Sequence, residues 1–526
     1  MRSPPVTTSI RAARLGVLVL LPILAFLPTC ANLDETPTSS ITPENFYRNE
    51  AELLGGLAGV YAQLRNTLWG YYNLSEISTD EMIVPTRGQD WYDNGRWLEI
   101  HHQAWGAGTP SGLDDVNGAW VDAFTGVARA NVVLNALGTV AVSNKDVVEA
   151  ELRTLRAFYY YQLMDFFGGV PVVTTTEIMP RERNTRDSVF KFIESELNAA
   201  RAVLPAQWPA TEQGRFTKGA ADAILANMYL NAGVFTKDAG VSATSYNSCK
   251  DVQIGAVTAC QAAIDAADRI LNSGVYSLAT DWRSSFRADN HTSPENILVV
   301  HHKAQSGLGL NFVMRLLHYN QFNPSPWNGF STLAETYYAF DSTWGGAGDQ
   351  RRQIFLVGPQ VNVETGAPVN DRTGQRLIFT PTIADATQAT EGEGVRIMKW
   401  PPDPGHASEN NGNDFAYFRL GEIYLIKAEA EFEAGNTAGA LALLNTLRAR
   451  VFTPANPLLV IDRAAILRER LFELTAEAKR RQDLIRFGQY TQAWGFKSAT
   501  DPSRILMPIP LTQIGANPLL TQNPGY

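Results

Sequence analysis

Flat aromatic rings and hydrogen-bonding side chains gather in two short parts of the sequence. Five of the eleven tryptophans fall between Trp69 and Trp120. Residues 79–97, TDEMIVPTRGQDWYDNGRW, interleave rings with carboxylate, amide and guanidinium groups, and residues 317–330, LHYNQFNPSPWNGF, mix rings with amides. Ring faces stack on the apolar C–H face of a sugar, whereas the polar groups hydrogen-bond its hydroxyls. This mixture predicts a surface with the chemistry of carbohydrate binding.

The candidate ligand-binding residues come from both segments. The set consists of Arg87, Asp90, Trp91, Tyr92, Asn94, Trp97, Tyr319, Asn320 and Trp327. We expect the aromatic members to stack on a ligand and the charged and amide members to bind its hydroxyl edge. The alternative for any single ring is a structural role, because aromatic side chains commonly fill a core or fix a loop.

Sequence motifs of catalysis are missing. The chain contains no G-x-S-x-G nucleophile elbow, no P-loop, no G-x-G-x-x-G and no H-E-x-x-H. The doublets His101-His102 and His301-His302 are poor chelates, since neighbouring residues on a strand point to opposite faces. We therefore expect no catalytic residue, no metal site and no cofactor. A glycoside hydrolase stays a weak alternative, because 53 acidic residues guarantee carboxylate pairs by chance.

Composition and charge narrow the class of protein. The chain has 526 residues, 45% of them hydrophobic and 18% charged, as in ordinary globular proteins. Its net charge of −9 argues against nucleic acid as a partner. No apolar run reaches the ~18 residues needed to span a bilayer.

The N-terminus has the pattern of an export signal. Residues 1–14 carry three arginines and no acid, and residues 15–27 are apolar throughout, which predicts a signal peptide over 1–29. LPTC at 27–30 is similar to a lipobox, so Cys30 is the expected lipidation site. The alternative is an ordinary cleavable signal. Residues 30–45 are small, polar and proline-bearing, which predicts a flexible tether.

Two further cysteines, Cys249 and Cys260, lie eleven residues apart. An exported chain meets an oxidising compartment, so a disulfide between them is the favoured hypothesis and two free thiols are the alternative. Zinc is disfavoured because neither a C-x-x-C motif nor a histidine lies nearby.

Hydrophobic spacing predicts a mainly α fold built from about four degenerate helix pairs of the tetratricopeptide type. The expected pairs are 50–66 with 118–137, 151–166 with 188–204, 224–233 with 260–274, and 420–432 with 441–447. Stacked pairs bury a continuous core. We divide the chain into an N-terminal helical region, 46–274, and a C-terminal region, 275–526.

Two long irregular segments, called excursions below, interrupt the helical pattern. Residues 67–117 and 275–413 are rich in glycine, proline, asparagine and aromatic residues, with short β pieces expected at 295–302 and 375–382. Loops of this length in a compact body are usually functional. A rigid helical scaffold that carries them is a common arrangement for binding sites.

Six segments, in order along the chain, resemble the SusD/RagB family of outer-membrane nutrient-binding lipoproteins. They are CANLDETP after the lipobox, AELRTLRAFYYYQLMDFFGGVPVV (150–173), GRFTKGAADAILANMYLNAG (214–233), FRLGEIYLIKAEAEFEAGN (418–436), RERLFELTAEAKRRQDLIRFG (468–488) and LMPIPLTQIGANPLLTQNPGY (506–526). The resemblance runs from Cys30 to the last residue. Thr29 stands where a smaller residue usually precedes the cysteine, and this difference affects only the expected lipid processing.

The resemblance implies a function, a cellular location and a partner. It implies a surface-exposed, lipid-anchored protein of the cell outer membrane that binds oligosaccharide without cleaving it. The implied partner is a TonB-dependent outer-membrane transporter of the SusC-like type, to which the glycan is delivered. A member of the same scaffold that binds peptides or another nutrient remains the alternative.

Overall fold

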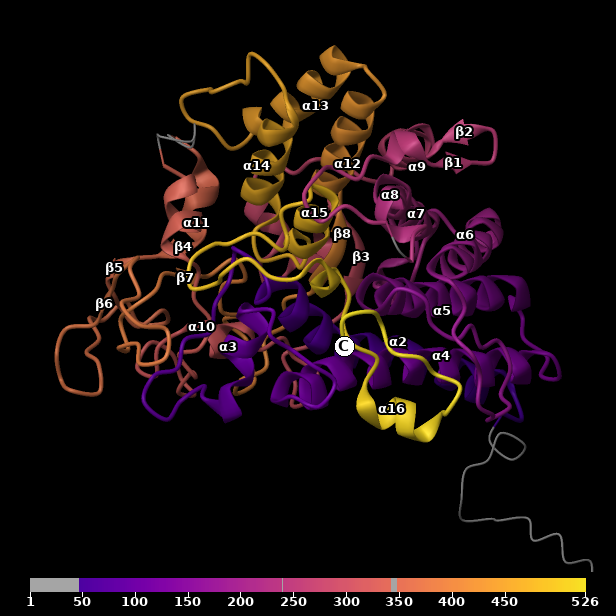
Figure 1. Cartoon of the computed structure of the whole chain (residues 1–526), viewed down its shortest axis with the longest axis horizontal. Helices are drawn as coiled ribbons and strands as arrows, with labels where there is room; N and C mark the ends of the chain where they lie inside the picture. Colours follow the sequence, from indigo (N-terminus) through magenta and orange to yellow (C-terminus); the bar gives the residue numbers. More distant parts are fainter. Residues whose placement is uncertain (1–46, 239, 342–347) are drawn as a thin grey trace, which may run out of the picture. The chain divides into compact units, whose positions relative to one another are not determined.

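The computed structural model describes residues 47–238, 240–341 and 348–526 (Figure 1). The predicted signal peptide, lipidated Cys30 and tether lie outside the described residues. Among the described residues, no helix is both long and apolar enough to span a membrane.

Eight helices form four packed pairs. The pairs are α2 (Glu50–Glu76) with α4 (Asn117–Leu137), α5 (Lys145–Phe167) with α6 (Arg186–Val203), α7 (Lys218–Leu230) with α9 (Ala259–Leu271), and α12 (Leu420–Glu433) with α13 (Thr437–Ala449). Successive pairs also touch, through α4 and α5, α6 and α7, and α9 and α12 (Figure 1). The predicted mainly α, tetratricopeptide-like architecture is therefore confirmed.

Side-chain caps fix where several of these helices begin. Asn49, Thr217, Thr258 and Asn436 each accept a hydrogen bond from a backbone N–H in the first turn of α2, α7, α9 and α13. Such caps satisfy donors that have no partner within the helix. At the other end of α5, Gly168 has φ +71°, a left-handed conformation that glycine adopts without a Cβ clash.

Helix pairs approach closely where side chains are small. A Cβ on Gly126 of α4 would lie 2.5 Å from the ring of Tyr159 on α5, so only glycine fits this crossing. The Tyr159 hydroxyl then donates to the carbonyl oxygen of Val60 on α2 (2.6 Å). One buried ring thus joins three helices of the first two pairs.

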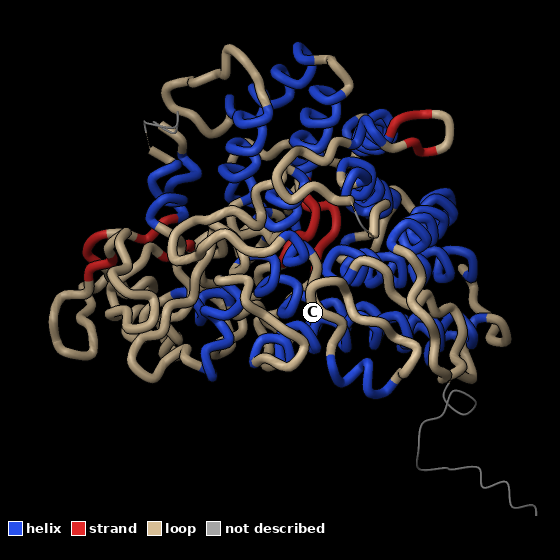
Figure 2. The backbone as a smooth tube through the Cα atoms, in the orientation of Figure 1, coloured by secondary structure: helices blue, strands red, loops and turns tan. Residues whose placement is uncertain are grey.

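Strands are few and short, as predicted. β3 (Asn296–Val300) pairs with β8 (Phe415–Arg419) in an antiparallel ladder, which brings the start of the 275–413 segment beside the strand that directly precedes α12 (Figure 2). The other two-stranded pairs are β1 (Gln253–Ile254) with β2 (Val257–Thr258), β4 (Phe355–Leu356) with β7 (Arg396–Ile397), and β5 (Gly358–Pro359) with β6 (Ile378–Phe379).

The first irregular segment, predicted over residues 67–117, begins later in the structure than expected. Residues 67–76 belong to α2 and are not part of a loop. This end of the helix is buried almost all round, so it has no polar stripe to reveal the helical period. The remaining helices are short: α3 (Arg96–His101), α8 (Ala232–Phe235), α10 (Phe312–Leu316), α11 (Ala334–Ala339), α14 (Arg463–Leu474), α15 (Arg480–Arg486) and α16 (Leu511–Ala516).

A buried network of ion pairs joins β8, α12, α14 and α15. Arg419 pairs with Glu473 (2.7 Å) and Glu477 (2.6 Å), and Arg486 pairs with Glu429 (2.6 Å) and Asp483 (2.8 Å). Removing one partner of such a pair would leave a buried charge uncompensated. The RERLFELTAEAKRRQDLIRFG segment is therefore part of the scaffold.

Cys249 and Cys260 form a disulfide with a Cα–Cα distance of 4.9 Å. It closes the β1–β2 hairpin onto the first turn of α9, inside the segment inserted between α7 and α9. α9 in turn packs against α12, and one core cluster includes residues from both predicted regions. The boundary at 274/275 stays a division made from the sequence.

Candidate ligand-binding surface

The two predicted loops meet in the structure. The Ile83 N–H donates to the Ser331 carbonyl oxygen (2.8 Å), and the Trp91 indole N–H donates to the Trp327 carbonyl oxygen (2.6 Å). The Tyr319 hydroxyl donates to the Asp90 carboxylate. Segments more than 200 residues apart in sequence therefore form one patch.

We call this patch the aromatic surface and define it by seven of the predicted residues: Asp90, Trp91, Tyr92, Asn94, Tyr319, Asn320 and Trp327. Tyr92 is the most open ring, with 55% of its surface exposed. Among the described residues, nothing forms a hydrogen bond or ring contact with the Tyr92 side chain. Trp91, Tyr319 and Trp327 are half-buried, and Asn94 and Asn320 are exposed.

Two predicted residues lie beneath this surface. Arg87 is 1% exposed and Trp97 is 2% exposed. The Trp97 indole N–H donates to Asp93 (2.7 Å), and its ring meets Trp91 edge to face at 5.2 Å. Burial therefore argues against direct ligand contact by either residue, and we correct their expected role to support of the loop. Trp105 and Trp120 are also sealed in the core.

Arg87 binds the backbone of the opposite loops. Its guanidinium donates to the carbonyl oxygens of Asn328 (2.8 Å), Gly329 (2.9 Å), Thr390 (3.2 Å) and Glu393 (2.8 Å), and to the Ser331 hydroxyl (2.9 Å). Burial lowers the pKa of Arg87 to about 10, so the group stays charged at neutral pH. A second buried arginine, Arg396, shares the Ser331 hydroxyl and also binds Asn328 (2.7 Å). The two cations hold the loops under the aromatic surface.

The backbone of the aromatic surface is strained. Trp91, Asp93, Asn94 and Asn328 have φ values of +62°, +39°, +58° and +50°. The left-handed region is unfavourable for a bulky residue such as tryptophan, and strain of this kind clusters at functional sites. A Cβ on Gly329 would lie 2.3 Å from the Trp91 ring. Glycine at this position therefore lets the ring pack on the backbone.

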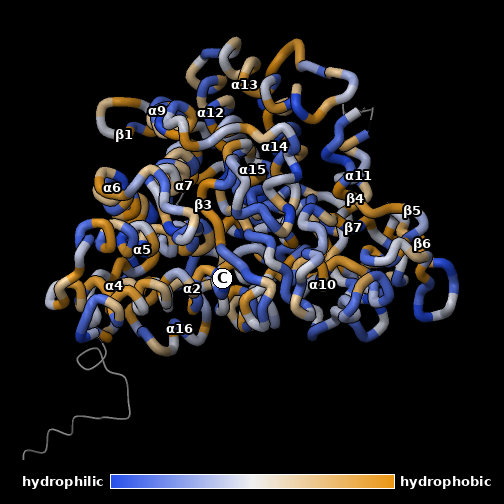
Figure 3. Tube along the Cα trace, turned by 180° about the vertical axis from the view of Figure 1, so that it is seen from behind, coloured by the Kyte–Doolittle hydropathy of each residue, from blue (hydrophilic) through white to orange (hydrophobic). Residues whose placement is uncertain are grey.

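A charged group that the sequence analysis missed adjoins the rings. Arg372 lies over the Tyr319 ring at 4.1 Å, pairs with Asp90 (3.0 Å) and binds the carboxylate of Glu391. His318 contacts the other oxygen of Glu391 (2.8 Å). Arg372 belongs to the hydrophilic loop between β5 and β6 (Figure 3). No spacing in the sequence connects that loop to residues near 90.

An open hollow lies beside the strained loop. It has a volume of about 630 Å³ and is lined by Asp93, Asn94, Arg96, Gly108, Pro110, Leu113 and Asp114. Arg96 pairs with Asp114 across it. The aromatic surface is thus bordered by space that a ligand could enter. Among the described residues, no group of His, Cys, Asp and Glu side chains could hold a metal ion.

The Glu391 carboxylate, which adjoins the aromatic surface, does not have the raised pKa of a glycosidase general acid. Burial alone would raise the pKa of Glu391, but the Arg372 backbone N–H and the His318 and Arg372 side chains outweigh it, so the pKa falls below its usual value. A general acid in glycoside hydrolysis needs the opposite shift. The arrangement can orient hydroxyl groups and stack on rings.

The fold is thus a scaffold of tetratricopeptide-like helix pairs, and the long loops between its helices form the aromatic surface. Two family profiles match most of the chain between them: one described as "SusD family" over residues 337–526, and one described as "Starch-binding associating with outer membrane" over residues 32–230. The chain belongs to the SusD/RagB family.

Curated relatives agree with this assignment, and a solved structure shares the fold. "SusD-like protein P25" of Formosa agariphila is 25% identical and aligns with 94% of this chain and 96% of the relative. "Starch-binding protein SusD" of Bacteroides thetaiotaomicron is 26% identical, over 86% of this chain and 85% of the relative. The structure of "Surface glycan-binding protein A from Bacteroides thetaiotaomicron in complex with laminarihexaose" covers 90% of this chain and 99% of its own, with 22% identity and a TM-score of 0.70.

Proposed function

We propose that this protein binds oligosaccharide at the aromatic surface, without cleaving it, and delivers it to a TonB-dependent outer-membrane transporter of the SusC-like type. The observation that carries the proposal is the open Tyr92 ring on a strained loop, beside half-buried Trp91, Tyr319 and Trp327. Flat faces with amide and carboxylate neighbours suit a ring of C–H groups edged by hydroxyls. The names of relatives, which include a starch-binding and a glycan-binding protein, support the same ligand class.

The test is calorimetry with a panel of neutral oligosaccharides and polysaccharides. We expect micromolar or weaker affinity, because isolated stacking contacts are weak. Tyr92→Ala removes a mostly exposed ring that makes no hydrogen bond or ring contact with the described residues, so it should lower the affinity roughly tenfold and change the unfolding free energy little.

The matched control is Tyr338→Ala, the same change at a tyrosine that is 47% exposed on α11. This variant should bind as the wild type does. If Tyr92→Ala and Trp327→Ala both bind every panel member with unchanged affinity, the aromatic surface is not the site.

The proposed setting is the cell surface, with a lipid on Cys30 and the body facing outward. Support comes from the LPTC motif and from the outer-membrane association named in the family description. Mass spectrometry of the membrane-extracted N-terminus tests the anchor, and an unmodified Cys30 would contradict it. Copurification with the transporter tests the partner.

Two alternatives are separated by simple assays. A peptide-binding role predicts calorimetric heat with peptides and none with glycans, and the charged trio of Asp90, Arg372 and Glu391 is the feature that would favour it. A glycoside hydrolase predicts new products on thin-layer chromatography after overnight incubation of oligosaccharide with pure protein. The lowered pKa of Glu391 argues against that outcome.

A further inference from the structure

A second hollow lies apart from the aromatic surface. It has a volume of about 300 Å³, at the lower end of the range for small-molecule sites, about 300–1,000 Å³. Its walls are the segment before α7 (206–217), residues 275–276 after α9, and residues 291–299 leading into β3. None of these residues belongs to the aromatic surface. We call it the Trp208 hollow.

Its aromatic ring is held in a fixed plane. The Trp208 indole N–H donates to the Phe216 carbonyl oxygen (2.9 Å), and the Arg215 guanidinium stacks on the ring at 3.7 Å. Trp208 is half-buried, so part of the indole lines the hollow. Tyr276 adds a second ring, positioned by a hydrogen bond between its hydroxyl and that of Thr217 (3.0 Å). These contacts orient two rings before any ligand arrives.

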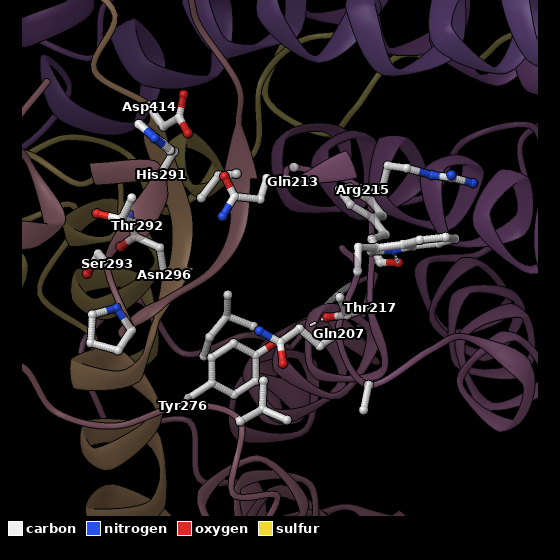
Figure 4. A pocket seen from close by; sticks show the side chains of 18 residues that line it. Gln207, Gln213, Arg215, Thr217, Tyr276, His291, Thr292, Ser293, Asn296 and Asp414 are labelled. Atoms are coloured by element: carbon white, nitrogen blue, oxygen red, sulfur yellow. Dashed lines mark hydrogen bonds between the residues drawn. The ribbon is translucent and has the colours of Figure 1, made fainter. Parts of the chain in front are cut away.

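Uncharged amide side chains border the two rings. Gln213, Asn296 and Gln207 surround an open space in Figure 4. Among the described residues, none bonds the Gln207 or Gln213 side-chain amide. The Asn296 side-chain oxygen is buried and likewise lacks a hydrogen bond within the described chain. Gln207 and Gln213 are exposed, so their amide groups can donate to and accept from a hydroxyl in the hollow.

Arg215 and Asp414, which line the hollow, already have close polar partners. Arg215 pairs with Glu151 and Glu212. Asp414 contacts His301 (3.1 Å) and accepts from the His302 backbone N–H (2.8 Å). A charged ligand would compete with these contacts at Arg215 and Asp414, whereas a neutral polyhydroxylated ring would find flat faces, donors and acceptors.

We propose that the Trp208 hollow is a second binding site, which takes one neutral sugar unit of the glycan. This inference rests on the proposed function, because it assumes that the same class of ligand reaches the protein. Two sites on one body let a long chain bind at both, so affinity for polysaccharide should exceed affinity for a short oligosaccharide.

The experiment is hydrogen–deuterium exchange of the whole exported protein with laminarihexaose, maltohexaose and mannohexaose at millimolar concentration. We expect the binding sugar to protect two regions, 87–97 and 206–217. Trp208→Ala and, separately, Gln213→Ala should abolish protection of 206–217 and leave that of 87–97. Calorimetry with the matching polysaccharide should then show roughly tenfold weaker binding.

Gln261→Ala, on the exposed face of α9, is the matched control and should change neither region. Gln213→Ala keeps the experiment decisive if Trp208→Ala is unstable, because Gln213 is exposed and bonds no described residue. Protection of 87–97 alone in the wild type would overturn the second site and leave the proposed function intact. Protection of neither region by any sugar would overturn both.

Discussion

Arg87 and Trp97 have residue types suited to a ligand, yet both lie under the aromatic surface. A guanidinium has five N–H donors in a planar fork. In Arg87 four of these donors bind backbone carbonyls of two other loops and the fifth binds the Ser331 hydroxyl, so none is left for a sugar. Residue type alone therefore could not separate an exposed side chain from a buried one that positions the loop.

Arg87→Lys keeps the charge but removes the fork. We expect the unfolding free energy to fall by about 2–4 kcal/mol, because several hydrogen bonds to a buried charge are lost. Glycan affinity should fall as well, since the loops at Asn328 and Glu393 lose their shared anchor. Chemical denaturation and calorimetry measure the two effects.

Arg352→Lys is the matched control on an exposed arginine and should change stability by less than about 0.5 kcal/mol. An Arg87→Lys variant with wild-type stability and affinity would refute the anchoring role.

At the scale of elements, hydrophobic periodicity predicted the four helix pairs from the sequence. Each pair shows a repeating apolar stripe, and residues such as Thr217 and Asn436 cap their helices. The last turns of α2 escaped detection because burial on all sides removes the polar stripe. The disulfide between Cys249 and Cys260 was one of two open hypotheses until the distance between the two residues was known.

That disulfide closes a short loop and should stabilise the insertion between α7 and α9. Reduction is expected to lower the unfolding free energy by on the order of 3 kcal/mol, through the greater freedom of the unfolded chain. Denaturation with and without reductant measures the loss. Thiol titration of protein that starts after Cys30 should give no free thiol before reduction and two afterwards.

Cys249→Ser with Cys260→Ser should show no further effect of reductant, which serves as the control. An equal response of this variant and the wild type to reductant would mean that the disulfide is not the cause.

At the scale of the whole molecule, the end of α2 meets the turn between α14 and α15. Glu81 accepts a hydrogen bond from the Ala476 backbone N–H (3.0 Å), and Glu76 accepts one from that of Ala478. Ala476 and Ala478 have φ values of +63° and +61°. Burial raises the pKa of Glu76 to about 7 and raises that of Glu81. The first and last parts of the fold are thus coupled through a titrating pair of carboxyls.

This pair predicts a pH dependence of stability. In the unfolded chain a glutamate loses its proton near its ordinary pKa of about 4.3, whereas the folded pair holds protons to higher pH. Rising pH between about 4.5 and 7 therefore favours the unfolded state, and the stabilisation present at low pH is lost. Glu76→Gln should flatten the fall in unfolding free energy over this interval.

Denaturation curves at a series of pH values check this slope. Glu409→Gln, at an exposed glutamate, is the control and should follow the wild type. A Glu76→Gln variant with the wild-type slope would show that the pair does not titrate in this range.

The sequence by itself determined the helix pairs, the mainly α class, the family resemblance and the two segments that meet at the aromatic surface. These features are local, because periodicity, caps and composition act over a few turns of chain. Only the tertiary structure decided which rings are open. It brought Arg372 to Asp90 across 282 residues, and it turned Arg87 inward. The exposure of a ring and the pairing of two charged side chains depend on contacts between distant segments, and local sequence patterns do not predict such contacts.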